Sequence, residues 1–373
     1  MDPWAWSAQV GVLLGVLAFL LLLVPVMGYQ YRRYGEFTPR RLLGAAAASV
    51  YGTSLLAYTL LPLPTSRGDW CALSAVSPQW HPLHFVADIS AAEARTGPFE
   101  VLSSRVTLQV LFNVILFVPW GVMVRGFWGR SMAVATGAGL LASLAIETTQ
   151  LTGFWGIYAC AYREFDVDDV LTNTLGAFIG AGIARWLLWW MPRPHSFDAT
   201  REIPRRVTSG RRWLGMAVDL AAFHALGFAL VVGYRVAQLV ATGEVPAQSD
   251  LAEAVLYALV PALCVFVLPA CQGTGASLGQ RAVRLVPVWD RRPAASLRLR
   301  RAAAVGGAYA MAEFCARWQD GTAWGDVSQV LARGLLLAAF VAVPLTRRRG
   351  LSALVTGARF EDERAHVTNA PAS

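Results

Sequence analysis

The sequence has 373 residues, of which 55% are hydrophobic and 15% are charged, and its formal net charge is +8 at pH 7. Because soluble domains carry about 25% charged residues, this composition excludes an ordinary soluble enzyme and a disordered chain, and it favours a multi-pass membrane protein. All 32 basic residues are Arg, and in such a protein we expect them in cytoplasmic loops rather than on a surface that binds nucleic acid.

Apolar segments predict about nine membrane-spanning helices. A helix needs about 20 apolar residues to cross a bilayer, and segments of this kind occur at 5–27, 42–61, 106–124, 131–151, 168–190, 213–240, 252–271, 302–316 and 328–345. The eighth segment is the shortest of the nine. The expected fold class is therefore all-α, a polytopic transmembrane helical bundle.

The arginines alternate between the segments that join these spans. The segments 28–41, 125–130, 191–212, 272–301 and 346–373 together hold 24 Arg, whereas the alternate segments hold only 5. By the positive-inside rule, the N-terminus is predicted outside and the C-terminus inside a bacterial plasma membrane. An odd number of spans agrees with this orientation, which therefore depends on the eighth span.

The chain is predicted to divide near residues 191–212. This stretch is polar, basic and interrupted by three Pro, as expected of a cytoplasmic linker. It separates a membrane domain of five spans, residues 1–190, from a membrane domain of four spans, residues 213–360. The remaining segment, 361–373, is predicted to be a disordered polar tail.

Ionisable groups inside or at the edge of a span are costly, so they indicate function by default. In the fourth span, Ser143, Glu147 and Gln150 share one helix face, because they are separated by four and three residues. Arg163 precedes the fifth span and is expected to pair with Glu147 or with a nearby Asp. These groups predict a polar pocket on the extracytoplasmic side.

Acidic residues open the fifth span. Asp166, Asp168 and Asp169 lie where a helix dipole favours negative charge. The face that begins at Asp169 continues through residues spaced by four, three and four positions: Asn173, Gly176 and Gly180. The two glycines are expected to let another helix approach closely. Asp166 and Asp168 fit a helix-capping role equally well.

The third span adds an amide to this pocket. Asn113 is expected to be its deeper hydrogen-bonding member, although Asn113 and Asn173 equally fit hydrogen bonds that simply join helices. Pro119 and Gly121 follow, and we expect them to kink or end the span.

Three motifs in this order resemble the VanZ-like family. They are N-x3-F-x-P-x-G from Asn113, E-x2-Q from Glu147, and R-x2-D-x-D-D-x3-N-x2-G from Arg163 to Gly176. The resemblance covers about residues 40–190. The family is named for a teicoplanin-resistance protein, so the resemblance implies a membrane protein with a role in tolerance to glycopeptide antibiotics or in cell-envelope physiology. It implies no particular reaction.

The second half resembles the RDD family over about residues 205–360. The resemblance rests on a basic residue at the end of the linker, an Asp in the sixth span and a G-x-S-x-G-Q-R motif after the seventh. The residues are Arg212, Asp219, Gly275, Gly279 and Arg281. The family's second Asp should stand four residues before Gly357, where this chain has Ala353. Ion transport that needs both acids is therefore not implied. The Lys-free, Ala-rich composition suggests a GC-rich bacterial genome, such as that of an actinobacterium.

Our first functional hypothesis is binding of an amphiphilic ligand at the outer leaflet, either a lipoglycopeptide or a lipid-linked envelope precursor. Glu147, Arg163 and Asp169 would form the polar end of that site. One alternative is a transporter or ion exchanger that titrates Glu147 and Asp219. Others are an envelope enzyme that uses the Asp cluster on a lipid-linked substrate, and an assembly module in which the polar residues only join helices.

The sequence indicates no further ligand class. His81 and His84 have no nearby acid to complete a metal-binding set, so neither a metal nor another cofactor is expected. The expected partners are the lipid bilayer and the amphiphilic ligand, with no nucleic acid. The sequence leaves the catalytic residues, if any, and the oligomeric state open.

Overall fold

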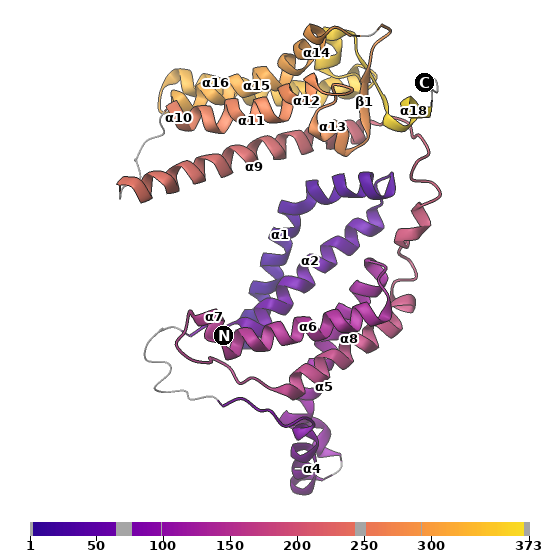
Figure 1. The fold of residues 1–373 in the computed structure, drawn as a ribbon, viewed down its shortest axis with the longest axis vertical. Coiled ribbons are helices and arrows are strands. Elements are labelled where there is room, and N and C mark those ends of the chain that lie inside the picture. Colours follow the sequence, from indigo (N-terminus) through magenta and orange to yellow (C-terminus); the bar gives the residue numbers. More distant parts are fainter. Residues whose placement is uncertain (1–2, 65–76, 98, 243–250, 292, 369–373) are drawn as a thin grey trace. The chain divides into compact units, whose positions relative to one another are not determined.

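The computed structural model describes residues 3–64, 77–97, 99–242, 251–291 and 293–368 (Figure 1). Within these ranges, seven helices are long and apolar enough to cross a membrane: Gln9–Tyr34, Pro39–Leu60, Arg105–Phe127, Met132–Leu151, Ser209–Ala241, Leu251–Cys271 and Ala323–Leu345. The chain is therefore a helical membrane protein, as its composition predicts. The count of nine spans and the orientation stay predictions.

Two expected spans are helical without being among those seven. Residues 168–190 correspond to α8 (Val167–Leu187), whose first two turns contain Asp168, Asp169 and Asn173. Residues 302–316 correspond to a π-helical turn, η6 (Ala303–Gly307), and to α15 (Ala308–Trp318), which has only 11 residues. Polar residues in α8 and the shortness of α15 account for the difference.

The chain forms two compact units. Unit 1 comprises residues 1–22 and 38–198, and unit 2 comprises residues 23–37 and 199–373. Helix α1 (Pro3–Tyr34) thus contributes to both units. These limits differ from the expected 1–190 and 213–360, because the segment after residue 190 is tied into unit 1: Arg41 donates hydrogen bonds to the carbonyls of Pro192 and Phe127.

Unit 1 is built from helices that pack around the buried side chain of Phe117. After the first part of α1, the elements are α2 (Pro39–Leu60), α4 (His84–Thr96), η1 (Glu100–Ser103), α5 (Arg105–Val122), the π-helical turn η2 (Met123–Phe127), α6 (Met132–Leu151), α7 (Gly153–Gly156), α8 and η3 (Pro194–Phe197). Figure 1 shows α5, α6 and α8 lying side by side.

Glycines set the closest helix contact in unit 1. A Cβ added at Gly121, Gly176 or Gly180 would lie 2.0–2.1 Å from a carbonyl oxygen of the facing helix. Helices α5 and α8 therefore touch backbone to backbone, which only residues without a side chain permit. Pro119 lies inside α5, and the helical path continues beyond it through η2 to Phe127.

Unit 2 packs its helices around the buried side chains of Phe223, Ala258 and Tyr309. Its elements after α1 are α9 (Ser209–Thr242), α10 (Leu251–Ala254), η4 (Val255–Leu259), α11 (Val260–Ala262), η5 (Leu263–Val267), α12 (Leu268–Cys271), α13 (Leu278–Ala282), β1 (Leu285–Val288), α14 (Ala295–Ala302), η6, α15, α16 (Ala323–Leu345), α17 (Leu351–Thr356), β2 (Arg359–Asp362) and α18 (Glu363–Thr368).

A two-stranded antiparallel sheet joins distant parts of unit 2. Strand β1 pairs with β2 so that Leu285 faces Asp362. Residues 361–368, expected in a disordered tail, instead complete β2 and form α18; residues 369–373 lie outside the described residues. The reason is electrostatic, since Asp362 accepts hydrogen bonds from Arg211 and Arg364 in a buried ion network.

Candidate functional site

The start of α8 gathers polar groups from three helices of unit 1. Glu147 of α6 is only 3% exposed, and its Oε2 accepts a hydrogen bond from the backbone N–H of Asp166 at 3.1 Å. Asn113 of α5 donates to Oδ1 of Asp169 at 2.6 Å. We call Asn113, Glu147, Arg163, Asp166 and Asp169 the α8 polar cluster. Its three carboxylates are close enough to repel one another, as the charges on Asp166 and Asp169 act on Glu147.

Arg163 is held by a main-chain carbonyl. Its Nη1 donates to the carbonyl oxygen of Thr59 at 2.8 Å, and Gln150 Nε2 donates to the same oxygen at 2.7 Å. Thr59 lies in the last turn of α2, where the helix dipole is negative. In the described part of the chain, no carboxylate lies within 4.0 Å of the Arg163 guanidinium. The expected ion pair with Glu147 or an Asp is therefore replaced by a carbonyl contact.

Asp166 and Asp168 cap two different helices. Asp166 is the N-cap of α8, where its side chain accepts a hydrogen bond from the N–H of Asp168 at 2.8 Å. Asp168 is buried and accepts hydrogen bonds from the N–H groups of Leu83 at 2.6 Å and Phe85 at 2.9 Å, at the start of α4. Burial raises the pKa of the Asp166 carboxyl above its ordinary value, and the hydrogen bond from Asp168 only partly offsets this.

Asn173 lies further along α8. Its Nδ2 donates to the Oγ of Ser143 at 2.9 Å, and both side chains are buried between α6 and α8. Asn173 therefore makes a hydrogen bond that joins α8 to α6, one of the two roles considered for it from the sequence. Its Oδ1 has no hydrogen-bond partner among the described residues, so the amide is only half satisfied.

Exposed apolar side chains lie directly beside the cluster. The segment before α4 runs parallel to the start of α8, since Gln79 donates its N–H to the carbonyl of Phe165 at 2.8 Å. The Trp80 ring lies against the Phe165 ring, with centroids 4.6 Å apart, yet Trp80 is 57% exposed. Leu83 and Val86 are also exposed. A polar site and an apolar surface therefore adjoin. Within the described ranges, no three His, Cys, Asp or Glu side chains are grouped to hold a metal ion.

The five residues singled out in the second half all lie in unit 2, in two sets of contacts. Asp219 of α9 accepts hydrogen bonds from Ser277 Oγ and from the N–H of Gly279, both at 2.6 Å. A Cβ at Gly279 would meet the carbonyl oxygen of Gly215 at 1.8 Å, so α9 and α13 touch there. Arg281 donates to the carbonyls of Ala276 and Pro269.

Arg212 and Gly275 make the second set of contacts, with residues from the C-terminal part of unit 2. Arg212 Nη2 donates to the carbonyl of Arg349 at 3.2 Å, and its guanidinium lies over the ring of Phe360. Gly275 has a positive φ of 76° and accepts a hydrogen bond from Arg301. Arg301 is buried, and sequence reasoning missed it because it belongs to an Arg-rich stretch that resembles a solvated loop.

Sequence reasoning also missed a chain of polar groups in the apolar helices of unit 2. His224 Nδ1 lies 2.7 Å from the hydroxyl of Tyr257, and its Nε2 lies 2.8 Å from the hydroxyl of Tyr309. Tyr309 donates to Oε1 of Glu313 at 3.1 Å. Tyr309 and Glu313 lie four residues apart on α15, whereas His224 and Tyr257 come from α9 and η4, so only the fold brings the three elements together.

A comparison with protein-family models gives a match in the first half of the chain. The family model VanZ/LLP1 matches residues 48–189, a range that contains every member of the α8 polar cluster. This part of the chain is thus similar to a membrane family related to glycopeptide resistance. The match ends before Asp219, so the likeness of the second half to the RDD family stays a prediction. Comparisons with curated proteins and with solved structures found no match.

Proposed function

We propose that the α8 polar cluster binds the polar part of an amphiphilic ligand at the outer surface of a bacterial plasma membrane. The ligand is an acylated glycopeptide or a lipid-linked envelope precursor, and its binding contributes to teicoplanin tolerance. One observation carries the proposal: Arg163 and three acids share a half-buried site, and no ion pair joins them in the described residues.

Ionised side chains such as those of Glu147 and Arg163 cost free energy when they lie in or beside a bilayer. Among the described residues, Glu147 accepts one hydrogen bond from a backbone amide and Arg163 donates to one carbonyl, so both groups keep capacity for a ligand. A ligand with a cationic and an anionic group satisfies both.

The neighbouring apolar surface supports a lipid-bearing ligand. Trp80 and Leu83 are each 57% exposed beside the acids at the start of α8. An acyl chain that covers these side chains gains about 25 cal/mol for each Å² of apolar surface removed from water. The same ligand without an acyl chain lacks this contribution.

The test uses a sensitive Gram-positive host that produces the wild type, Glu147→Gln or Arg163→Gln at matched membrane levels. Inhibition of growth by teicoplanin is compared with inhibition by vancomycin, which has no acyl chain. We expect the wild type to protect against teicoplanin, and each variant to lose that protection. Glu164→Gln is the matched control, because Glu164 is an exposed acid next to Arg163.

Two results would contradict the proposal. One is a wild type that gives no protection against teicoplanin. The other is protection that persists in both Glu147→Gln and Arg163→Gln. The wild type could also protect equally against vancomycin, with that protection lost in both variants. The α8 polar cluster would then bind a part of the glycopeptide other than the acyl chain.

One observation favours a second candidate, proton-coupled ion exchange through unit 2. The linked side chains of Tyr257, His224, Tyr309 and Glu313 are suited to relay protons. Asp219 and Glu147 belong to different units, and Asp219 is already occupied by two hydrogen bonds. Proton flux into liposomes that contain the full chain tests this candidate. We expect Glu313→Gln to abolish the flux, and persistence of flux in that variant would exclude this route.

A further inference from the structure

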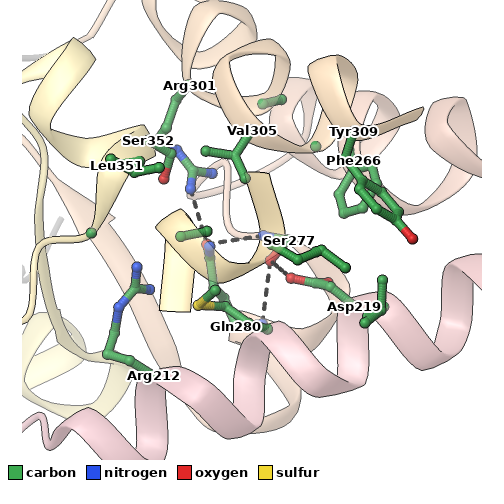
Figure 2. A pocket seen from close by; sticks show the side chains of 17 residues that line it. Arg212, Asp219, Phe266, Ser277, Gln280, Arg301, Val305, Tyr309, Leu351 and Ser352 are labelled. Carbon is green, nitrogen blue, oxygen red and sulfur yellow. Dashed lines mark hydrogen bonds between the residues drawn. The ribbon is translucent and has the colours of Figure 1, made fainter. Parts of the chain in front are cut away.

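A cavity of about 110 Å³ lies within unit 2, where α9, α14 and the start of α17 meet (Figure 2). Its polar end is formed by Arg212, Ser277, Gln280 and Arg301. Its apolar lining includes Phe266 and Val305. A cavity with this division suits a ligand that has one charged group and one apolar part.

Both arginines at the polar end are buried. Arg212 and Arg301 are each 4% exposed, and their guanidiniums lie over the same ring, with Cζ 3.4 Å and 5.9 Å from the Phe360 centroid. Figure 2 shows both side chains reaching the cavity from opposite sides. Two positive charges are therefore held close together away from water, an arrangement that an anion stabilises.

Neither guanidinium has an acid as its partner in the described part of the chain. Arg212 donates to the carbonyl of Arg349, and Arg301 donates to the carbonyl of Gly275 and to Gln280 Oε1. The Nε atom of each has no hydrogen-bond partner among the described residues. Arginine presents its donors as a planar fork that matches phosphate oxygens.

Asp219 is the one carboxylate among the described residues that line the cavity, and it is already hydrogen-bonded. Both oxygens of Asp219 accept short hydrogen bonds, from Ser277 and from Gly279. Two cations and this fixed anion leave one net positive charge at the polar end. A ligand with a single negative charge balances it, which a phosphodiester carries and a phosphate monoester exceeds.

We propose that this cavity binds the phosphodiester of an anionic lipid, with Arg212 and Arg301 contacting its oxygens. The cavity lies at the ends of apolar helices, because Arg212 is in the first turn of α9 and Gly350 follows the end of α16. Lipid phosphates are found at such helix ends. The site belongs to unit 2 and is independent of the α8 polar cluster.

The experiment uses the full chain purified in detergent, with lipid binding followed by native mass spectrometry. Phosphatidylglycerol, whose headgroup is a monoanion, is compared with phosphatidylcholine, which is neutral overall. We expect the wild type to retain phosphatidylglycerol preferentially and Arg301→Gln to raise its Kd about tenfold or more. Arg300→Gln is the matched control, since Arg300 is the exposed neighbour on the same helix and loses the same charge.

A separate arm distinguishes lipid from free anion. Inorganic phosphate is added to the wild type, and the thermal unfolding temperature is recorded. Stabilisation by phosphate without retention of phosphatidylglycerol would overturn the lipid assignment and leave a site for a soluble anion. Equal retention of the two lipids by the wild type, with no effect of phosphate, would overturn the proposal entirely.

A second variant keeps the proposal testable if Arg301→Gln fails to fold. Val305→Phe fills the cavity from an apolar lining position and keeps both arginines in the sequence. It is expected to abolish preferential retention of phosphatidylglycerol. Retention equal to that of the wild type in Val305→Phe or in folded Arg301→Gln would show that the lipid binds elsewhere on the arginine-rich surface.

Discussion

The carboxylate of Asp168, in the first turn of α8, accepts a hydrogen bond at 2.6 Å from the backbone N–H of Leu83, 85 residues earlier in the chain. A second hydrogen bond comes from the N–H of Phe85. These amides lie at the start of α4 and have no partners within that helix. One acid therefore fastens α4 to the helix that carries the α8 polar cluster.

Replacement of Asp168 by Ala should loosen α4 selectively. Loss of such a cap typically costs about 1–2 kcal/mol, and here it also leaves two amides unpaired. Hydrogen exchange of residues 83–96 should accelerate in Asp168→Ala, while exchange in α6 stays unchanged. Glu93→Ala, which removes an exposed acid from α4, is expected to have no such effect. Unchanged exchange in Asp168→Ala would show that other contacts hold α4.

Helix α8 offers an internal comparison of glycines. Gly176→Ala should destabilise the protein, because the new Cβ would lie 2.1 Å from the carbonyl oxygen of Val114 and force α5 away. A Cβ added at Gly182 would meet no atom within 4 Å, so Gly182→Ala should raise stability by about 1 kcal/mol through helix propensity. Thermal unfolding of the two variants in one detergent tests the opposite signs. If both variants lost stability, the close contact between α5 and α8 would not be the cause of the loss in Gly176→Ala.

Asp362 should be a major source of stability in unit 2. Its carboxylate pairs with Arg211 at 2.8 Å and with Arg364 at 2.6 Å, and all three side chains are buried. Removal of one partner from a buried ion network costs about 3–5 kcal/mol, so Asp362→Asn should lower the unfolding free energy by that order. Glu361→Gln, an exposed change one residue earlier, should cost little. Similar unfolding free energies for the two variants would refute a structural role for the network.

The pH dependence of this effect has a defined sign. Burial alone raises the pKa of Asp362, but hydrogen bonds from Arg364, Arg205 and Arg211 outweigh it and hold the pKa well below its ordinary value. The stability that Asp362 contributes is therefore complete above the unfolded pKa of about 3.9 and is lost only as pH falls through the lowered value. Asp362→Asn should cost the same at pH 7 and pH 5. A penalty that shrinks between those values would contradict a lowered pKa.

The apolar segments were predictable because hydrophobic length is a local property of the sequence. The predicted first to fourth spans and the sixth, seventh and ninth correspond to the seven helices that suit a membrane. The proximity of Glu147 and Asp169 follows from the predicted topology, in which the end of the fourth segment and the start of the fifth are joined by a short loop. The partner of Arg163 was not predictable, because Thr59 contributes a carbonyl oxygen, which no side-chain pattern reveals.

The arginines were the least predictable residues. A composition without Lys places most Arg in polar loops, and this is where the sequence put Arg211, Arg301 and Arg364. In the structure all three are buried, and each is bound by groups that lie far away or in another element. Arg211 and Asp362 are 151 positions apart, a separation over which periodicity carries no information.

The course of α1 has a consequence for how this protein can be divided by evolution or by cloning. Residues 23–37 belong with unit 2, where Arg32 forms an ion pair with Glu363 and Glu36 forms one with Arg205. A gene fragment that begins at the predicted linker would encode unit 2 without these contacts. A second half expressed alone from that point would therefore lack the part of α1 that packs with unit 2.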